Sequence, residues 1–254
     1  MLDILQIPVL NDNYIYMLHD SVSLETAVID PALEQPVLDV LAEKGWQLNF
    51  ILNTHHHWDH VGANLALKQQ TGCKVIAASS DQERIPGIDI CVEQGDVFSL
   101  GEHQAQVLET PGHTSGHVVY YFAGDQALFC GDTLFIMGCG RLFEGTPGQM
   151  YASLQTLKAL PPSTRVYCTH EYTLANASFA LSVEPDNVCV QQKLLAVAEL
   201  RAENKPTVPS TIAEEIATNP FFRVDCISIQ KELGLVGAEL DVVFAALRHR
   251  KDNF

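Results

Sequence analysis

The chain has 254 residues, of which 47% are hydrophobic and 18% charged, as expected for a globular protein with a substantial core. A net charge of −16 disfavours nonspecific nucleic-acid binding, because neutralising phosphates requires clustered Lys and Arg. No apolar run approaches the roughly 18 residues of a membrane span, so no membrane association is expected. The start of the chain lacks a basic signal segment, and the seven cysteines are scattered without a C-x-x-C motif. We therefore expect a cytoplasmic protein with reduced thiols.

Short apolar segments bounded by turn residues predict many strands before about residue 172. They are residues 5–9, 14–18, 26–29, 50–52, 74–78, 96–101, 104–110, 118–122, 127–130 and 165–168. Helical spacing predicts helices at 36–42, 61–68 and 148–160, and residues 81–93 are expected to be irregular. The later segments 174–181, 188–201, 211–217 and 238–248 have helical periodicity, and no strand is expected among them. The pattern predicts an α+β domain over residues 1–171 and a smaller helical domain over 172–254.

Four histidines and an aspartate follow directly after the predicted strand 50–52, in the sequence THHHWDH at 54–60. In an extended segment His55 and His57 leave the same face, while His56 points away. They can therefore share one metal ion. Asp59 and His60 follow where the chain turns toward a helix, so they face another direction and suit a second ion. The alternative for this stretch alone is a His-rich surface tract that binds metal adventitiously.

Three further side chains follow predicted strands in the same way, namely His113 in TPGHT, Asp132 in GDT and His170. Taken singly, such histidines are more often core or surface residues, and Asp132 can be a simple turn residue. Their shared position at strand ends favours metal binding. We expect one ion on His55, His57 and His113, a second on Asp59, His60 and His170, and Asp132 as a bridge between them.

Nitrogen and carboxylate ligands without thiolates suit zinc, with iron and manganese as alternatives. Two divalent ions carry four positive charges, of which Asp59 and Asp132 offset two, so a bridging hydroxide is favoured. Such a hydroxide is a nucleophile at neutral pH, and the same ions can polarise a carbonyl group. The predicted chemistry is hydrolysis, with Asp59 and Asp132 as its catalytic carboxylates.

The H-x-H-x-D-H pattern with a later His, Asp and His resembles the metallo-β-lactamase superfamily. The resemblance to its glyoxalase II (hydroxyacylglutathione hydrolase) family is closer and covers almost the whole chain, including the helical tail. It rests on residues 11–14 (NDNY), 110–114 (TPGHT), 129–135 (FCGDTLF), 138–141 (GCGR), 143–146 (FEGT), 170–173 (HEYT) and 219–221 (NPF).

This resemblance implies an αββα sandwich followed by a helical domain, and a monomer is expected. It also implies hydrolysis of the glutathione thioester S-D-lactoylglutathione to D-lactate and glutathione, in methylglyoxal degradation. Glutathione would be held by Arg141, Phe143, Tyr172, Arg248 and Lys251. The family often has a tyrosine at the position of Phe143, so a hydroxyl contact is missing there.

The residues around these positions also have plainer interpretations. The basic run 248–251 can be a solvated tail, and its charges are expected to be exposed, so that removing them changes stability by less than about 0.5 kcal/mol. His117 is expected to be structural. Gly138, Gly140 and Gly145 are expected to shape a loop, since none opens a helix after a strand as a dinucleotide site requires.

Three other functions fit the same fold. A nuclease is disfavoured by the net charge of −16, and a di-iron redox protein would need an electron-donor domain for which the chain has no room. A catalytically silent glutathione- or metal-binding module is disfavoured by the complete ligand set, and a thioester hydrolysis assay separates it from an enzyme.

Overall fold

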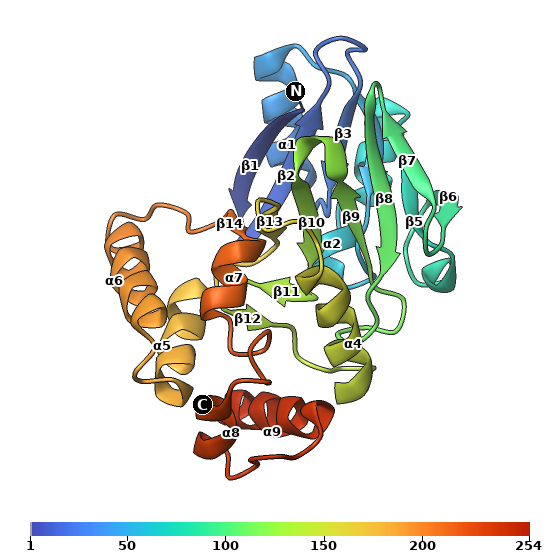
Figure 1. Cartoon of the computed structure of the whole chain (residues 1–254). Coiled ribbons are helices and arrows are strands. Elements are labelled where there is room, and N and C mark those ends of the chain that lie inside the picture. The colour runs from blue at the N-terminus through green and yellow to red at the C-terminus, as the bar shows by residue number, and fades with distance from the viewer. Residues whose placement is uncertain (1) are drawn as a thin grey trace. The chain divides into compact units, whose positions relative to one another are not determined.

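The structure is a computed structural model that describes residues 2–254. The chain forms two compact units, which are described one at a time. The first comprises the residues up to Glu109 together with Gly116–Gly131, and the second comprises Thr110–Ser115 and Asp132–Phe254. Figure 1 labels elements of both units where there is room.

The first unit contains a six-stranded sheet whose strands lie side by side in chain order. These strands are β1 (Asp3–Val9), β2 (Asn13–His19), β3 (Thr26–Ile29), β4 (Leu48–Leu52), β5 (Lys74–Ala78) and β6 (Ile88–Val92). The first three pair antiparallel, and β3 to β6 pair parallel. Parallel neighbours require crossover connections. Helix α1 (Glu34–Lys44) connects β3 to β4, and α2 (Trp58–Val61) and α3 (Asn64–Thr71) connect β4 to β5.

Apolar side chains from this sheet and from α1 and α3 form one core. Val37 and Leu41 of α1 and Leu67 of α3 pack with Val28 and Ile51 of the central strands. The helix α1 stops at Gly45, whose φ of 68° lies in the left-handed region that glycine adopts without steric cost. The segment 53–60 begins directly after β4, at the end of a central strand of this sheet.

A second group of strands in the first unit forms an antiparallel meander. It consists of β7 (Val97–Leu100), β8 (His103–Glu109), β9 (Val118–Phe122) and β10 (Ala127–Gly131). The first unit also contains two short 3-10 helices. These are η1 (Ser79–Asp81), which follows β5, and η2 (Ala123–Asp125), which lies between β9 and β10. The ring of Tyr16 in β2 meets that of Phe129 in β10 edge-on at 5.5 Å, and Phe50 meets Phe98 at 5.2 Å. These contacts show that the two groups of strands pack face to face.

The second unit is mainly helical. Its helices are α4 (Pro147–Lys158), α5 (Thr173–Val183), α6 (Val188–Ala202), α7 (Ile212–Thr218), α8 (Ile227–Glu232) and α9 (Leu240–Asp252). Its strands are the short pairs β11 (Leu134–Phe135) with β12 (Gly138–Cys139) and β13 (Arg165–Cys168) with β14 (Ser210–Thr211). Figure 1 shows α5 beside α6 and α4 beside α9. The Thr211 hydroxyl caps α7 by accepting a hydrogen bond from the Glu214 amide.

Several predicted boundaries are wrong for identifiable reasons. The predicted irregular section contains β6, a strand at the end of its sheet order with three exposed side chains, so it shows no buried alternation. The strand β14 lies in the region where only helices are expected, and it exists through its pairing with β13. The helix predicted at 61–68 is interrupted at Gly62 and Ala63, which separate α2 from α3.

Among the helices described in residues 2–254, none combines the length and the apolar character that crossing a membrane would require.

Candidate metal centre

The first unit brings together the four predicted ligands of the motif that follows β4. His55 Nε2 lies 3.0 Å from His57 Nδ1, so the two rings converge on one point. His56 faces Asp81 instead, with Nδ1 3.4 Å from the carboxylate. His55 and His57 therefore face each other while His56 contacts Asp81, although the chain bends at Thr54 and His55 and forms no strand there.

A buried carboxylate orients the histidines of this first half-site. Asp30, directly after β3, accepts a 2.6 Å hydrogen bond from the Thr54 hydroxyl and lies 3.0 Å from His60 Nδ1. The Thr54 hydroxyl in turn lies 3.0 Å from His55 Nδ1. Partners on Nδ1 fix the ring of a metal-binding histidine and present its Nε2 to the ion. Asp30 and Thr54 were not predicted, although Asp30 also follows a strand.

Asp59 and His60 form a second pair on α2, which begins at Trp58. Asp59 Oδ2 lies 3.6 Å from His60 Nε2 and accepts a 3.0 Å hydrogen bond from the Asn13 side chain. This amide belongs to the NDNY segment on which the family resemblance partly rests. The first half-site thus offers two pairs of ligand atoms, and the rings of His55 and His60 bring these pairs together with centroids 4.0 Å apart.

In the second unit, His113 and His170 lie on either side of the Asp132 carboxylate. Asp132 Oδ2 lies 3.4 Å from His113 Nε2 and 3.5 Å from His170 Nε2. The other oxygen, Oδ1, accepts a 2.6 Å hydrogen bond from the Thr169 hydroxyl. Ligand atoms about 2.0 to 2.1 Å from a tetrahedral ion are separated by about 3.3 Å, so these distances suit a carboxylate shared by two ions. Thr169 was not predicted as a functional residue, and its place beside His170 was the signal available.

The loops around this second half-site are packed so closely that they require glycine. His113 Nδ1 lies 2.9 Å from the carbonyl oxygen of Arg141. A Cβ at Gly140 would collide with the Asp132 carbonyl, and one at Gly145 would lie 2.6 Å from the Cα of Gly112. The glycines of this segment therefore shape the loop that holds His113, as expected.

Two aromatic rings flank the second half-site. Tyr172 stacks on His170 with ring centroids 4.8 Å apart, and Phe143 meets His113 edge-on at 5.2 Å. Phe143 is 64% exposed and Tyr172 is also exposed, although both are large and apolar. Exposed rings beside a buried polar site can bind a ligand.

The predicted basic cluster at the C-terminus is less exposed than the sequence suggests. Arg248 is only 4% exposed, donates a 2.8 Å hydrogen bond to the Cys139 carbonyl and pairs with Asp252 at 2.8 Å. The expectation that its charge is solvated is wrong, because Cys139 and the ring of Phe221 enclose the guanidinium. Lys251 is half-buried, and its Nζ lies 5.1 Å from the centre of the Phe179 ring. Burial, followed by the positive charges of Arg248 and Arg141, lowers the pKa of Lys251 to about 8.

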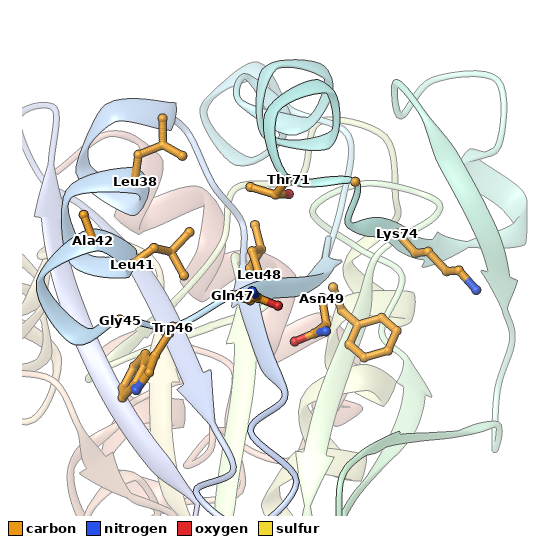
Figure 2. A pocket seen from close by; sticks show the side chains of 12 residues that line it. Leu38, Leu41, Ala42, Gly45, Trp46, Gln47, Leu48, Asn49, Thr71 and Lys74 are labelled. Atoms are coloured by element: carbon orange, nitrogen blue, oxygen red, sulfur yellow. The ribbon is translucent and has the colours of Figure 1, made fainter.

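An open hollow of about 840 Å³ lies elsewhere in the first unit, where β4 begins. Figure 2 shows Leu38, Leu41 and Trp46 on one side of it and Lys74 on the other. It contains none of the predicted site residues. We therefore place the candidate site at the histidines.

Comparison with known proteins agrees with this fold. The family model for the metallo-β-lactamase superfamily matches residues 17–170, and the one for the hydroxyacylglutathione hydrolase C-terminus matches residues 171–254. ETHE1 from Myxococcus xanthus superposes with a TM-score of 0.67 and 26% identity, covering 99% of this chain and 98% of that one. The protein TTHA1623, solved in a di-iron-bound form, superposes with a TM-score of 0.62 and 26% identity, covering 86% of this chain and 99% of that one. Fold and half-sites together define a metallo-β-lactamase superfamily protein with His and Asp groups able to bind metal ions.

Whole-length relatives narrow this class to one family. The hydroxyacylglutathione hydrolase of Methylococcus capsulatus is 55% identical over 254 residues, covering 100% of this chain and 99% of that protein. That of Maricaulis maris is 52% identical over 249 residues, covering 98% of this chain and 97% of that protein. The chain belongs to the hydroxyacylglutathione hydrolase family and is a hydrolase. The predicted fold class and the family resemblance are confirmed.

Proposed function

We propose that this chain hydrolyses S-D-lactoylglutathione and related 2-hydroxyacylglutathione thioesters to the hydroxy acid and glutathione, as a step in methylglyoxal detoxification. The observation that carries the proposal is the Asp132 carboxylate. One of its oxygens lies close to the Nε2 atoms of both His113 and His170. The chain is also 55% identical over its length to a hydroxyacylglutathione hydrolase.

Two divalent ions fit the donor atoms of the two half-sites. In this proposal His55, His57 and His113 hold one ion, and Asp59, His60 and His170 hold the other, with Asp132 bridging. When bound, such ions lower the pKa of water to about 7 and polarise a carbonyl group, which is the chemistry of thioester hydrolysis. Zinc is the proposed metal, and the di-iron form of TTHA1623 supports iron as the alternative.

The protein groups supply orientation and charge. Thr169 holds one oxygen of Asp132, and Asp30 holds His60, so neither ligand must reorganise during the reaction. Asp59 and Asp132 offset part of the positive charge of two divalent ions. We propose that Phe143 and Tyr172 contact the glutathione portion of the substrate with their exposed rings.

A local positive charge supports glutathione as the bound group. The chain has a net charge of −16, yet Arg141, Arg248 and Lys251 lie close enough that the two arginines lower the pKa of the lysine. Bringing like charges together costs free energy that a bound anion offsets. Glutathione carries carboxylates, so it is a suitable anion for the group formed by Arg141, Arg248 and Lys251.

We expect purified protein to contain about two metal ions per chain and to hydrolyse S-D-lactoylglutathione far faster than the same acyl group on a small uncharged thiol. The reason is that binding energy from the charged glutathione portion assists the reaction at a distant thioester. Elemental analysis together with kcat/KM for the two thioesters measures both. Equal kcat/KM for the two substrates would contradict glutathione recognition, and an inactive metal-loaded protein would favour the silent binding module.

The reaction is also expected to run without a dedicated protein acid. A thiolate, whose conjugate acid has a pKa of about 8.5, can leave without prior protonation. His117 lies outside the proposed ligand set, and its ring stacks on that of His55 with centroids 4.9 Å apart. We expect His117→Gln to retain most of its kcat at full metal occupancy. A fall in the kcat of the wild-type protein at high pH that is absent from this variant would show that His117 donates a proton. The mechanism would then have to change.

We propose a cytoplasmic monomer that binds no nucleic acid. All seven cysteines are free thiols, and one chain supplies both half-sites. Light scattering during size-exclusion chromatography tests the oligomeric state.

A further inference from the structure

Asp81, the last residue of η1, places a buried carboxylate next to the metal-binding motif. Its side chain is fully buried, and Oδ2 lies 3.4 Å from His56 Nδ1. On its other side Oδ1 accepts a 3.1 Å hydrogen bond from Arg84 Nε and pairs with the terminal guanidinium nitrogen. The carboxylate therefore connects the centre of the His55–His57 segment to an arginine at the surface.

The same carboxylate lies against a second loop of the first unit. A Cβ at Gly116 would collide with Asp81 Oδ1, so the Gly116 backbone passes directly against the carboxylate. The next residue, His117, stacks on His55 with the ring planes at 20°. Asp81 thus contacts His56, which lies between two predicted ligands. It also contacts Gly116, which precedes His117.

We propose that Asp81 is a positioning residue for the metal centre, which it controls through His56 and Gly116. The inference rests on the proposed function, because it takes His55 and His57 as ligands of one ion. Neither His56 nor Asp81 binds the ion in this proposal.

The physical reason lies in the order of these residues in the chain. His56 lies between His55 and His57. A shift of the His56 backbone therefore moves both neighbouring rings together. Small misplacements of ligands matter because metal sites tolerate only narrow deviations in geometry.

Asp81→Asn is expected to weaken zinc affinity about 10-fold, the lower end of the effect of residues behind metal ligands. The affinity is measured by titrating the metal-free protein with zinc against a chromophoric chelator. Excess zinc should restore most of kcat, since the ligands themselves remain. Wild-type zinc affinity in a folded Asp81→Asn protein would overturn the proposal.

Asp125→Asn is the matched control. Asp125 also ends a 3-10 helix, and its largely buried carboxylate lies 2.7 Å from a histidine, His103, that is not a predicted ligand. The same substitution there should leave zinc affinity unchanged. An equal loss of zinc affinity in both variants would show a general effect of destabilisation and would overturn the positioning role.

His56→Phe tests the same contact from the other side and covers the case in which Asp81→Asn fails to fold. It should weaken zinc affinity about as much as Asp81→Asn, and the double variant should add little more. Additive losses, or an unchanged affinity in His56→Phe, would overturn the coupling. The titration uses no thioester, so an inactive wild-type protein would refute the proposed function without affecting this result.

Discussion

Asp132→Ala is expected to abolish thioester hydrolysis and to reduce the metal content below two ions per chain. One oxygen of this carboxylate lies 3.4 Å and 3.5 Å from the ligand nitrogens of His113 and His170. Its loss therefore removes a ligand from both proposed ions at once, together with a negative charge between two cations. The fall in kcat/KM should exceed the loss of about 10- to 100-fold that is typical of residues behind the ligands.

Thr169→Val provides the graded comparison for this experiment. It removes the hydroxyl that donates to Asp132 Oδ1 but leaves the carboxylate in place. We expect about a 10-fold loss of activity with two metals retained. Elemental analysis and turnover are measured on all three proteins. Two metals and near-normal turnover in Asp132→Ala would rule out the bridging role.

Lys251→Met is expected to raise KM for the glutathione thioester about 10-fold or more with little change in kcat. A hydrogen bond to a charged group contributes about 1.5 to 3 kcal/mol, and a remote contact of this kind stabilises the bound substrate and the transition state equally. The long Met side chain keeps the contact with the Phe179 ring. Arg250→Met is the control, because it removes a neighbouring cation that pairs with Glu232 at 2.8 Å.

The pH dependence of KM gives a second test of Lys251. Its pKa is lowered from 10.5 to about 8, so the charge that attracts carboxylates is present below pH 8 and is lost as the pH rises above it. Apparent KM should therefore increase above about pH 8 in the wild-type protein, and this increase should be absent in Lys251→Met. A KM that is insensitive to the substitution would leave the terminal cluster without a role in binding.

Arg248→Ala and truncation after Tyr172 would be poor tests of glutathione binding. Arg248 is buried against Cys139, so removing it disturbs the segment that leads to Arg141. The helices after Tyr172 also support that segment. The Asn219 side chain donates hydrogen bonds to the carbonyls of Phe135 and Gly138, and Glu215 accepts one from the Met137 amide. Either change would mix loss of binding with loss of structure.

Local patterns were sufficient to propose the ligands of the site. The spacing of His55 and His57 alone predicts that they share one face. Most strands and helices were predicted for the same reason, since their apolar periodicity is a property of neighbouring residues. The strands that were missed, β6, β11, β12 and β14, exist through pairing with a partner, and little in their own residues predicts them.

The tertiary structure decided which groups stand behind the ligands and which charges are buried. The side chains of Asp30, Asp81 and Thr169 contact histidines or carboxylates that lie in other parts of the sequence. Arg248 is enclosed by residues far away in the chain. Such contacts depend on distances in space, which a spacing pattern does not contain. The sequence alone thus determined the family and supplied the candidate ligands, because both lie in short motifs. Only the fold decided the orientation of each ring and the burial of Arg248, because hydrogen bonding and desolvation depend on residues brought together by packing.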